Sequence, residues 1–167
     1  MHGMTTAHAP VRLQLADESA TQRLGEAIAA RLAERPSESL RIWLEGDLGA
    51  GKSTLARACL RALGVTGPIK SPTYTLVERY PLSDGSEAWH LDLYRISDPE
   101  ELDYLGLDEA AVRVWLIEWP ERGREELIPP DLRIRLMQTP DGAREALITA
   151  TNNKTVDIVT KLAEEFH

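Results

Sequence analysis

The chain has 167 residues, 43% of them hydrophobic, which suffices for one globular domain whose core needs no disulfide or metal to support it. Its net charge of −8 argues against a stand-alone nucleic-acid-binding protein, because such affinity comes mostly from neutralising phosphates. The chain has a single cysteine, no apolar run of membrane length and no leading signal-peptide pattern, so we expect a cytoplasmic protein that makes no contact with a membrane.

The first elements are predicted from hydrophobic spacing. We expect residues 1–10 to be disordered and residues 11–167 to form one domain that begins with a short alternating strand over 11–15. Ser19 is then expected to open a helix, with Gln22 completing a capping box. Three leucine and isoleucine residues at helical spacing form its apolar stripe: Leu24, Ile28 and Leu32.

A strand, a glycine-rich loop and a helix follow in the order of a nucleotide-binding unit. Residues 40–45 are rich in strand formers, and residues 46–53 read Gly-Asp-Leu-Gly-Ala-Gly-Lys-Ser, a complete G-x-x-x-x-G-K-[ST] phosphate loop. A helix is predicted over 53–63, with Cys59 packed in the core. The pattern indicates a nucleotide with Mg²⁺, in which Lys52 reaches the β- and γ-phosphates and the Ser53 hydroxyl binds the metal.

The middle of the chain is predicted to hold a hairpin and a second central strand. Residues 74–80 and 88–94 are expected as its two strands. Asp98-Pro99-Glu100-Glu101 is a strong helix start, and this short helix is expected to stop near Gly106. Residues 112–119 form a largely apolar run, the best candidate for a second central strand, and helix or loop is expected from Pro120 onward.

The end of the chain is predicted to hold two more strands and a helix. The strands are expected over 132–137 and 145–149, joined by a turn at 140–142. A helix is expected from Thr155 to the end of the chain.

Phosphate-loop enzymes usually place a carboxylate near Mg²⁺ and a group that positions water. Glu118 ends the apolar strand over 114–117, and Asp92 ends the segment over 88–91, so both are candidate metal ligands beside Ser53. The alternatives are a surface residue for Glu118 and a turn or salt-bridge residue for Asp92. Thr73 lies where switch-type nucleotidases carry a threonine that senses Mg²⁺ and the γ-phosphate, or it caps a turn.

Three further residues are open to two interpretations. Lys70 and Arg95 are possible partners for transition-state charge or solvated surface residues, and Trp119 belongs to the core or lies near the nucleotide. The guanine-specific N-K-x-D pattern is missing from the sequence, since residues 153–156 depart from it by one position. ATP is therefore favoured over GTP, and a switch GTPase is disfavoured.

Several motifs in this order closely resemble the TsaE family of small bacterial ATPases, also called YjeE. The similarity covers roughly residues 18–148. The motifs that carry it are Gly-Asp-Leu-Gly-Ala-Gly-Lys-Ser-Thr (46–54), Lys-Ser-Pro-Thr-Tyr-Thr-Leu-Val-Glu (70–78), His-Leu-Asp-Leu-Tyr-Arg (90–95), Asp-Pro-Glu-Glu-Leu (98–102) and Glu-Trp-Pro-Glu (118–121).

The resemblance implies a role in making N6-threonylcarbamoyladenosine at position 37 of tRNAs that read codons beginning with A. It implies TsaD and TsaB as partners, with tRNA reached through that complex, and ATP and Mg²⁺ as cofactors. It assigns Lys52 and Ser53 to phosphates and metal, Thr73 to the switch-like position, and Asp92 and Glu118 to the acidic positions, with Glu118 as a metal ligand. Relatives often have threonine where this chain has Ser53, but both hydroxyls bind Mg²⁺.

The resemblance also implies nucleotide contacts from the first helix and from a late glycine–arginine segment. The full set of candidate nucleotide-binding residues is Glu18, Thr21, Asp47, Leu48, Gly49, Ala50, Gly51, Lys52, Ser53, Thr54, Trp119, Gly142 and Arg144.

Motifs and resemblance together predict an α/β, P-loop NTPase-like three-layer fold with a central mixed sheet flanked by helices. They predict an ATPase that is slow without its partners and has Lys52, Thr73, Asp92 and Glu118 as catalytic residues. A small-molecule kinase and a non-hydrolysing nucleotide-binding module are the alternatives.

Overall fold

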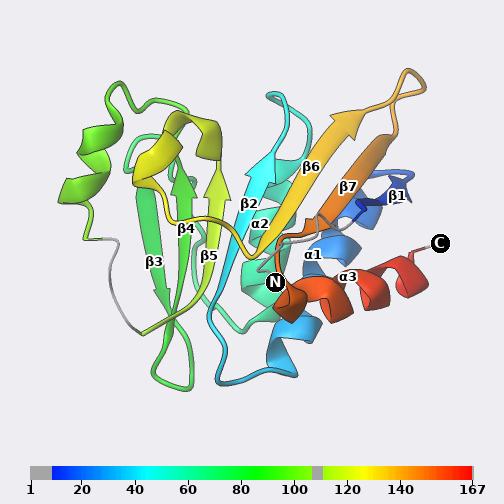
Figure 1. The fold of residues 1–167 in the computed structure, drawn as a ribbon, viewed down its shortest axis with the longest axis horizontal. Coiled ribbons are helices and arrows are strands. Elements are labelled where there is room, and N and C mark those ends of the chain that lie inside the picture. Colours follow the sequence, from blue (N-terminus) through cyan, green and yellow to red (C-terminus); the bar gives the residue numbers. More distant parts are fainter. Residues whose placement is uncertain (1–8, 107–110, 167) are drawn as a thin grey trace, which may run out of the picture.

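A mixed sheet forms the centre of the molecule. The computed structural model describes residues 9–106 and 111–166. Within that part the strand order is β1-β7-β6-β2-β5-β4-β3 (Figure 1). The strands are β1 (Val11–Leu15), β2 (Leu40–Glu45), β3 (Val77–Pro81), β4 (Glu87–Asp92), β5 (Val112–Glu118), β6 (Leu132–Gln138) and β7 (Arg144–Ala150).

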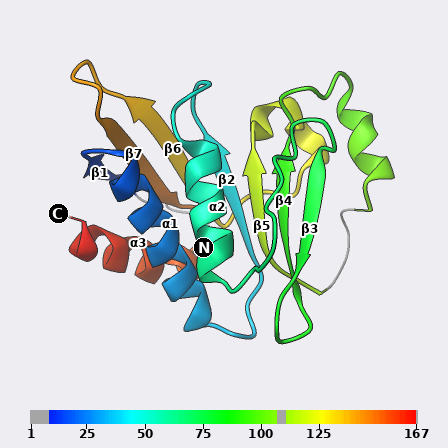
Figure 2. The same ribbon diagram turned by 180° about the vertical axis from the view of Figure 1, so that it is seen from behind.

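Helices flank this sheet. The α-helices are α1 (Glu18–Ala33), α2 (Lys52–Ala62) and α3 (Asn153–Glu165), and three 3₁₀-helices are η1 (Pro99–Tyr104), η2 (Pro120–Arg122) and η3 (Arg124–Glu126). In the view from behind, α1 and α2 lie in front of the sheet (Figure 2). The predicted α/β fold class is confirmed.

Parallel pairing in the middle of the sheet brings three loops to one edge. β2 runs parallel to both β5 and β6, and β4 runs parallel to β5. The carboxyl ends of β2, β5 and β4 therefore lie side by side, which is where open α/β sheets bind their ligands. The outer strands of the sheet pair antiparallel. On one side β3 pairs with β4, and on the other β7 pairs with both β6 and β1.

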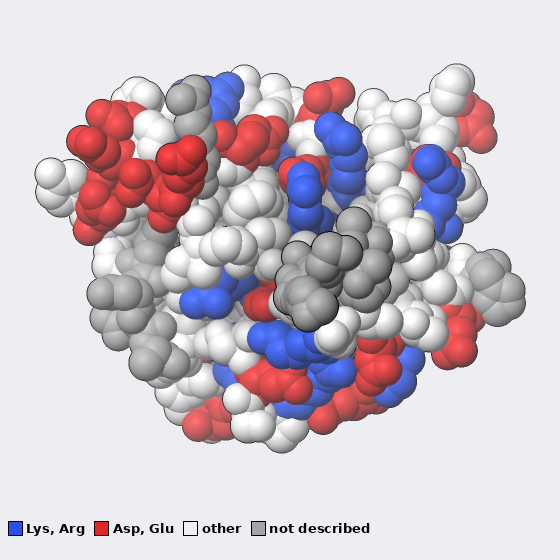
Figure 3. Space-filling model, viewed as in Figure 1, with Lys and Arg blue, Asp and Glu red and all other residues white. Residues whose placement is uncertain are grey.

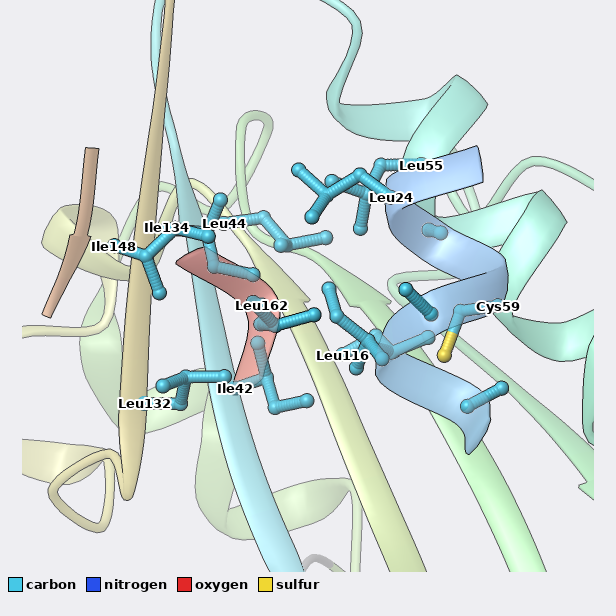
Figure 4. Close-up of a cluster of buried hydrophobic side chains, with 14 of the residues drawn as sticks. Leu24, Ile42, Leu44, Leu55, Cys59, Leu116, Leu132, Ile134, Ile148 and Leu162 are labelled. Atoms are coloured by element: carbon cyan, nitrogen blue, oxygen red, sulfur yellow. The ribbon is translucent and has the colours of Figure 1, made fainter. Parts of the chain in front are cut away.

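The larger core lies between the sheet and the three α-helices. Every second side chain of the central strands points to this side. Leu24, Leu55 and Cys59 pack against them from α1 and α2 (Figure 4). Cys59 is completely buried, as its predicted core role requires, and burial raises the pKa of its thiol to about 12.

A second core lies on the opposite face of β4 and β5, against η1 and the segment after η3. The rings of Trp89 and Trp115 pack there at a tilt of 58° with centroids 4.8 Å apart, and Leu102 and Leu127 belong to the same cluster. Acidic side chains gather on the surface over η1 (Figure 3). This smaller core holds the ends of β4 and β5 in place from the side that the α-helices do not cover.

Two predicted element starts are wrong. The α1 helix is capped by Asp17, whose side chain accepts a hydrogen bond from Ala20 N at 2.9 Å, whereas Ser19 lies inside the helix. The first hairpin strand begins at Val77 and not at residue 74, because Leu76 takes a left-handed backbone conformation with φ 70°. This conformation closes a turn, with Leu76 N donating to Pro72 O, and the register pairs of the strand begin with Val77 opposite Leu91.

The other predicted elements are found close to their expected bounds. The hairpin of β3 and β4 and the second central strand β5 are confirmed, and α3 begins two residues before the predicted Thr155. Among the described residues, no helix is both long and apolar enough to cross a membrane. The predicted disorder of residues 1–10 falls mostly on residues 1–8, which lie outside the described part.

Candidate nucleotide-binding site

The phosphate loop connects β2 to α2 and depends on glycine geometry. Gly46, Gly49 and Gly51 have φ values of 140°, 80° and 109°, which side chains rarely permit. A Cβ at Gly46 would lie 2.4 Å from the carbonyl oxygen of Leu136. Helix α2 begins without a side-chain cap, so its first amides and the positive end of its dipole are available to an anion.

Lys52, the first residue of α2, is folded back over this loop. Only 4% of its surface is exposed, and its ammonium group donates to the carbonyl of Gly46 and, at 3.3 Å, to that of Asp47. It also lies 4.0 Å from the centroid of the Trp119 ring. Burial lowers the pKa of the Lys52 ammonium, while the nearby Glu118 carboxylate opposes that shift.

Ser53 faces the two predicted acids. Its Oγ donates to the Oε1 and Oε2 atoms of Glu118, at 3.1 and 3.2 Å. Asp92 and Glu118 are direct register partners at the ends of β4 and β5, and both are buried. Burial raises the pKa of the Asp92 carboxyl, and the charge of Glu118 adds to that shift, while a hydrogen bond from Tyr94 N opposes it. The surface-residue alternative for Glu118 is therefore wrong.

His90 is a residue at this site to which the sequence motifs assigned no role. It is buried on β4, and its Nε2 lies 2.6 Å from Oε2 of Glu118. The only sequence signal was its place in the His-Leu-Asp-Leu-Tyr-Arg motif, two positions before Asp92.

The phosphate loop, Asp92 and Glu118 line a cavity of about 480 Å³, and His90 lies behind Glu118 without lining it. Thr73 lines it, with its hydroxyl 2.6 Å from that of Ser71, and Trp119 lines it while also packing against the second core. The lining residues that had been predicted at the site are Asp47, Leu48, Gly49, Ala50, Gly51, Lys52, Ser53, Thr54, Thr73, Asp92, Glu118, Trp119 and Arg144. Arg95 also lines the cavity, as does Tyr94, which the sequence did not single out.

The predicted contacts outside the loop are only partly brought together. The Arg144 guanidinium reaches the cavity and donates to the hydroxyl of Thr21 at 3.4 Å. Glu18 accepts a hydrogen bond from Thr54 at 3.4 Å, so α1 is tied to the loop through Glu18 and Thr21 without lining the cavity. Gly142 lies in the exposed β6–β7 turn and is not among the described lining residues.

The donor set suits Mg²⁺ that is shared with phosphates. In the described part of the chain, no three or more His, Cys, Asp or Glu side chains cluster as a metal cage. Mg²⁺ typically binds through one or two carboxylates, phosphate oxygens and water, and Ser53, Glu118 and Asp92 supply a hydroxyl and two carboxylates. These residues fit the ion predicted from the phosphate loop.

Comparison with known proteins gives the family of this chain. The family model described as "Threonylcarbamoyl adenosine biosynthesis protein TsaE" matches residues 15–146. The protein named "tRNA threonylcarbamoyladenosine biosynthesis protein TsaE" from Haemophilus influenzae is 40% identical over 139 residues, 81% of this chain and 87% of that protein. Its namesake from a Nostoc species is 36% identical over 157 residues, 89% and 91% of the two chains.

A solved structure shares the fold. The crystal structure of YdiB from Bacillus subtilis superposes with a TM-score of 0.76 and 26% identity, covering 98% of this chain and all of that one. A family-model match over most of the domain, relatives above 30% identity and a shared fold lead to one conclusion. The chain belongs to the TsaE family of tRNA threonylcarbamoyladenosine biosynthesis.

Proposed function

We propose that this chain is a P-loop ATPase that binds Mg²⁺·ATP and hydrolyses it by in-line attack of water on the γ-phosphate. One observation carries the proposal: Lys52, Ser53, Asp92 and Glu118 converge on one cavity from three adjacent strand ends. Residues so far apart in sequence meet there only because β4, β5 and β2 run parallel.

Each residue has a distinct role in this proposal. Lys52 turns from the loop carbonyls to the β- and γ-phosphates, and with the loop amides it stabilises the charge that develops in the transition state. Ser53, Glu118 and Asp92 would hold Mg²⁺, and the bound ion would neutralise phosphate charge. Thr73 occupies the switch-like position and orients the loop over 70–76 toward the nucleotide.

We further propose that the ATPase acts with TsaB and TsaD in the cytoplasm, where it lets their complex form N6-threonylcarbamoyladenosine repeatedly at position 37 of tRNA. Family membership supports this, because the curated relatives carry that pathway in their names. The net charge of −8 also favours it, because a protein that reaches tRNA through other proteins needs no large excess of basic residues.

The test is formation of the modified nucleoside on unmodified tRNA by purified TsaB and TsaD, with and without this chain and ATP. We expect many product molecules per complex only when wild-type chain and ATP are both present. Lys52→Ala should remove this stimulation, whereas Lys161→Ala, which changes a half-exposed lysine on α3, should keep it. Equal product without the chain would overturn the proposed role.

A further inference from the structure

His90 has no role in the chemistry described so far, although it contacts Glu118, which lines the cavity. It is 1% exposed and sits on β4, directly opposite Leu116 of β5. Its Nε2 is 2.6 Å from Oε2 of Glu118, which is shorter than the 3.1 and 3.2 Å hydrogen bonds from Ser53 to the two carboxylate oxygens. A buried imidazole on a central strand is a rigid partner, since both the backbone and the ring are fixed by packing.

The geometry gives the direction of this hydrogen bond. A carboxylate oxygen accepts, so Nε2 of His90 donates. The other ring nitrogen, Nδ1, is buried and has no hydrogen-bond partner in the described part of the chain. An imidazole that carries its hydrogen on Nε2 leaves only a lone pair at Nδ1, so no buried N–H goes unpaired.

Glu118 has two other neighbours that compete for its oxygens. Ser53 Oγ lies 3.1 and 3.2 Å from them, but this hydroxyl must turn away when it binds the metal. The Lys52 ammonium is also attracted, and Glu118 is the charge that acts most strongly on the pKa of Lys52. A carboxylate drawn toward Lys52 would be withdrawn from the metal site and would hold the lysine away from phosphate.

We propose that His90 is a positioning residue that fixes Glu118 as a ligand for Mg²⁺. By holding Oε2, it would keep the Glu118 carboxylate facing Ser53, where the ion would bind, and away from Lys52. Partners of this kind orient metal ligands, and their loss costs about 10- to 100-fold in metal affinity. The inference rests on the proposed Mg²⁺·nucleotide site.

Three substitutions separate a donor role from simple packing. His90→Gln places an amide N–H close to the position of Nε2, His90→Asn carries the same group but is too short to reach it, and His90→Leu removes the donor. Leu91→Val is the matched control, because Leu91 is buried on the same strand but points into the second core. Melting temperatures of all four variants identify any that fail to fold.

The measurement is ADP affinity by calorimetry at a series of Mg²⁺ concentrations, which requires no turnover. We expect the Mg²⁺ midpoint to rise at least about tenfold in the Asn and Leu variants and to stay within about threefold in the Gln variant. ADP affinity without Mg²⁺ should be the same in all variants, and Leu91→Val should follow the wild type.

The outcomes separate the two claims. If ADP binding by the wild type is independent of Mg²⁺, the proposed function fails and the inference fails with it. If the wild type depends on Mg²⁺ but the Asn variant behaves like it, or the Gln variant shifts as far as the Asn variant, only the inference about His90 is overturned. The Gln and Asn pair decides the matter even if the Leu variant does not fold.

Discussion

Two parts of the cavity lining are held in different ways. The phosphate loop is fixed by the fold: Lys52 is 4% exposed, and Gln138 of β6 donates to the carbonyl of Gly49 at 3.1 Å. The segment over 70–76 is anchored at its ends, where Lys70 N donates to Tyr80 and Leu76 O accepts from Asp92 N, but its middle is held more lightly. Among the described residues the hydroxyl of Thr73 meets only that of Ser71, and Tyr74 is 80% exposed, with Arg95 over its ring. The loop is therefore preorganised for the phosphates of the proposed nucleotide, and we propose that the 70–76 segment is the part that responds to the γ-phosphate.

The largest effect is expected in the preorganised part. Lys52→Ala should weaken ATP binding at least about 100-fold, because it removes a charged donor worth about 3 kcal/mol to the phosphates. Calorimetric titration with ATP measures this directly, and Lys161→Ala is the control for a loss of positive charge elsewhere. Unchanged ATP affinity in the Lys52 variant would remove the basis of the site assignment.

The next effect concerns hydrolysis. Glu118→Gln keeps the shape of the side chain but loses the charge, so Mg²⁺-dependent phosphate release should fall about 100-fold. ADP binding without Mg²⁺ should change little, because Glu118 contacts the site through Ser53 and the metal position. Glu45→Gln, at the end of β2 and paired with Arg133 on the surface, is the matched control. Wild-type turnover in the Glu118 variant would contradict its role.

A smaller effect is expected in the lightly held middle of the 70–76 segment. Thr73→Ala should lower phosphate release about tenfold while ADP affinity stays unchanged, because the hydroxyl is expected to act on the γ-phosphate alone. Ser71→Ala removes the partner of Thr73 and should have a weaker effect. If both variants lose ADP affinity equally, the segment is part of the ground-state binding surface, and the contrast between the two parts is wrong.

A pH effect on stability follows from Asp92. Its pKa is raised in the folded protein, so folding is favoured while this carboxyl is protonated and loses that contribution as pH rises through the raised value. Without Mg²⁺, Asp92→Asn should therefore melt slightly above the wild type near pH 7, and the difference should vanish at about pH 4. Thermal melts across this range test the sign, and a difference that grows toward acid would contradict it.

The smallest effect is expected from chemical modification of the native Cys59 thiol. Cys59 is completely buried on α2 behind the phosphate loop, with a pKa of about 12, so a thiol reagent should modify it only as the protein unfolds. Tyr74→Cys should add a second thiol that reacts at once, because that position is 80% exposed. Rapid modification of Cys59 in the native protein would show that α2 is not rigid.

The sequence predicted best the parts whose geometry is local. The β2–loop–α2 unit was found within a residue of its predicted bounds, because glycine positions and hydrophobic spacing determine it. Asp92 and Glu118 were predicted as candidate metal ligands because strand ends can be recognised from apolar runs. The left-handed Leu76 was not predictable, since leucine rarely adopts that conformation and only the tertiary structure imposes it.

The contacts that the sequence missed are the long-range ones. The bond between His90 and Glu118 joins residues 28 positions apart and depends on the register between β4 and β5, which no pattern in either strand determines. The tie between Arg144 and Thr21 likewise needs β7 beside β1 and α1. The resemblance to the family named both Thr21 and Arg144, whereas the spacing of residues in the sequence could not.

Phosphate release from Mg²⁺·ATP tests most directly the central claim that this site is an ATPase. It is measured with and without purified TsaD and TsaB, and Lys52→Ala serves as the blank. The account predicts slow release by the chain alone, faster release when both partners are added, and none above background in the variant. Release that is absent with both partners present, while wild-type ATP binding stays tight, would contradict the claim that this site is an ATPase.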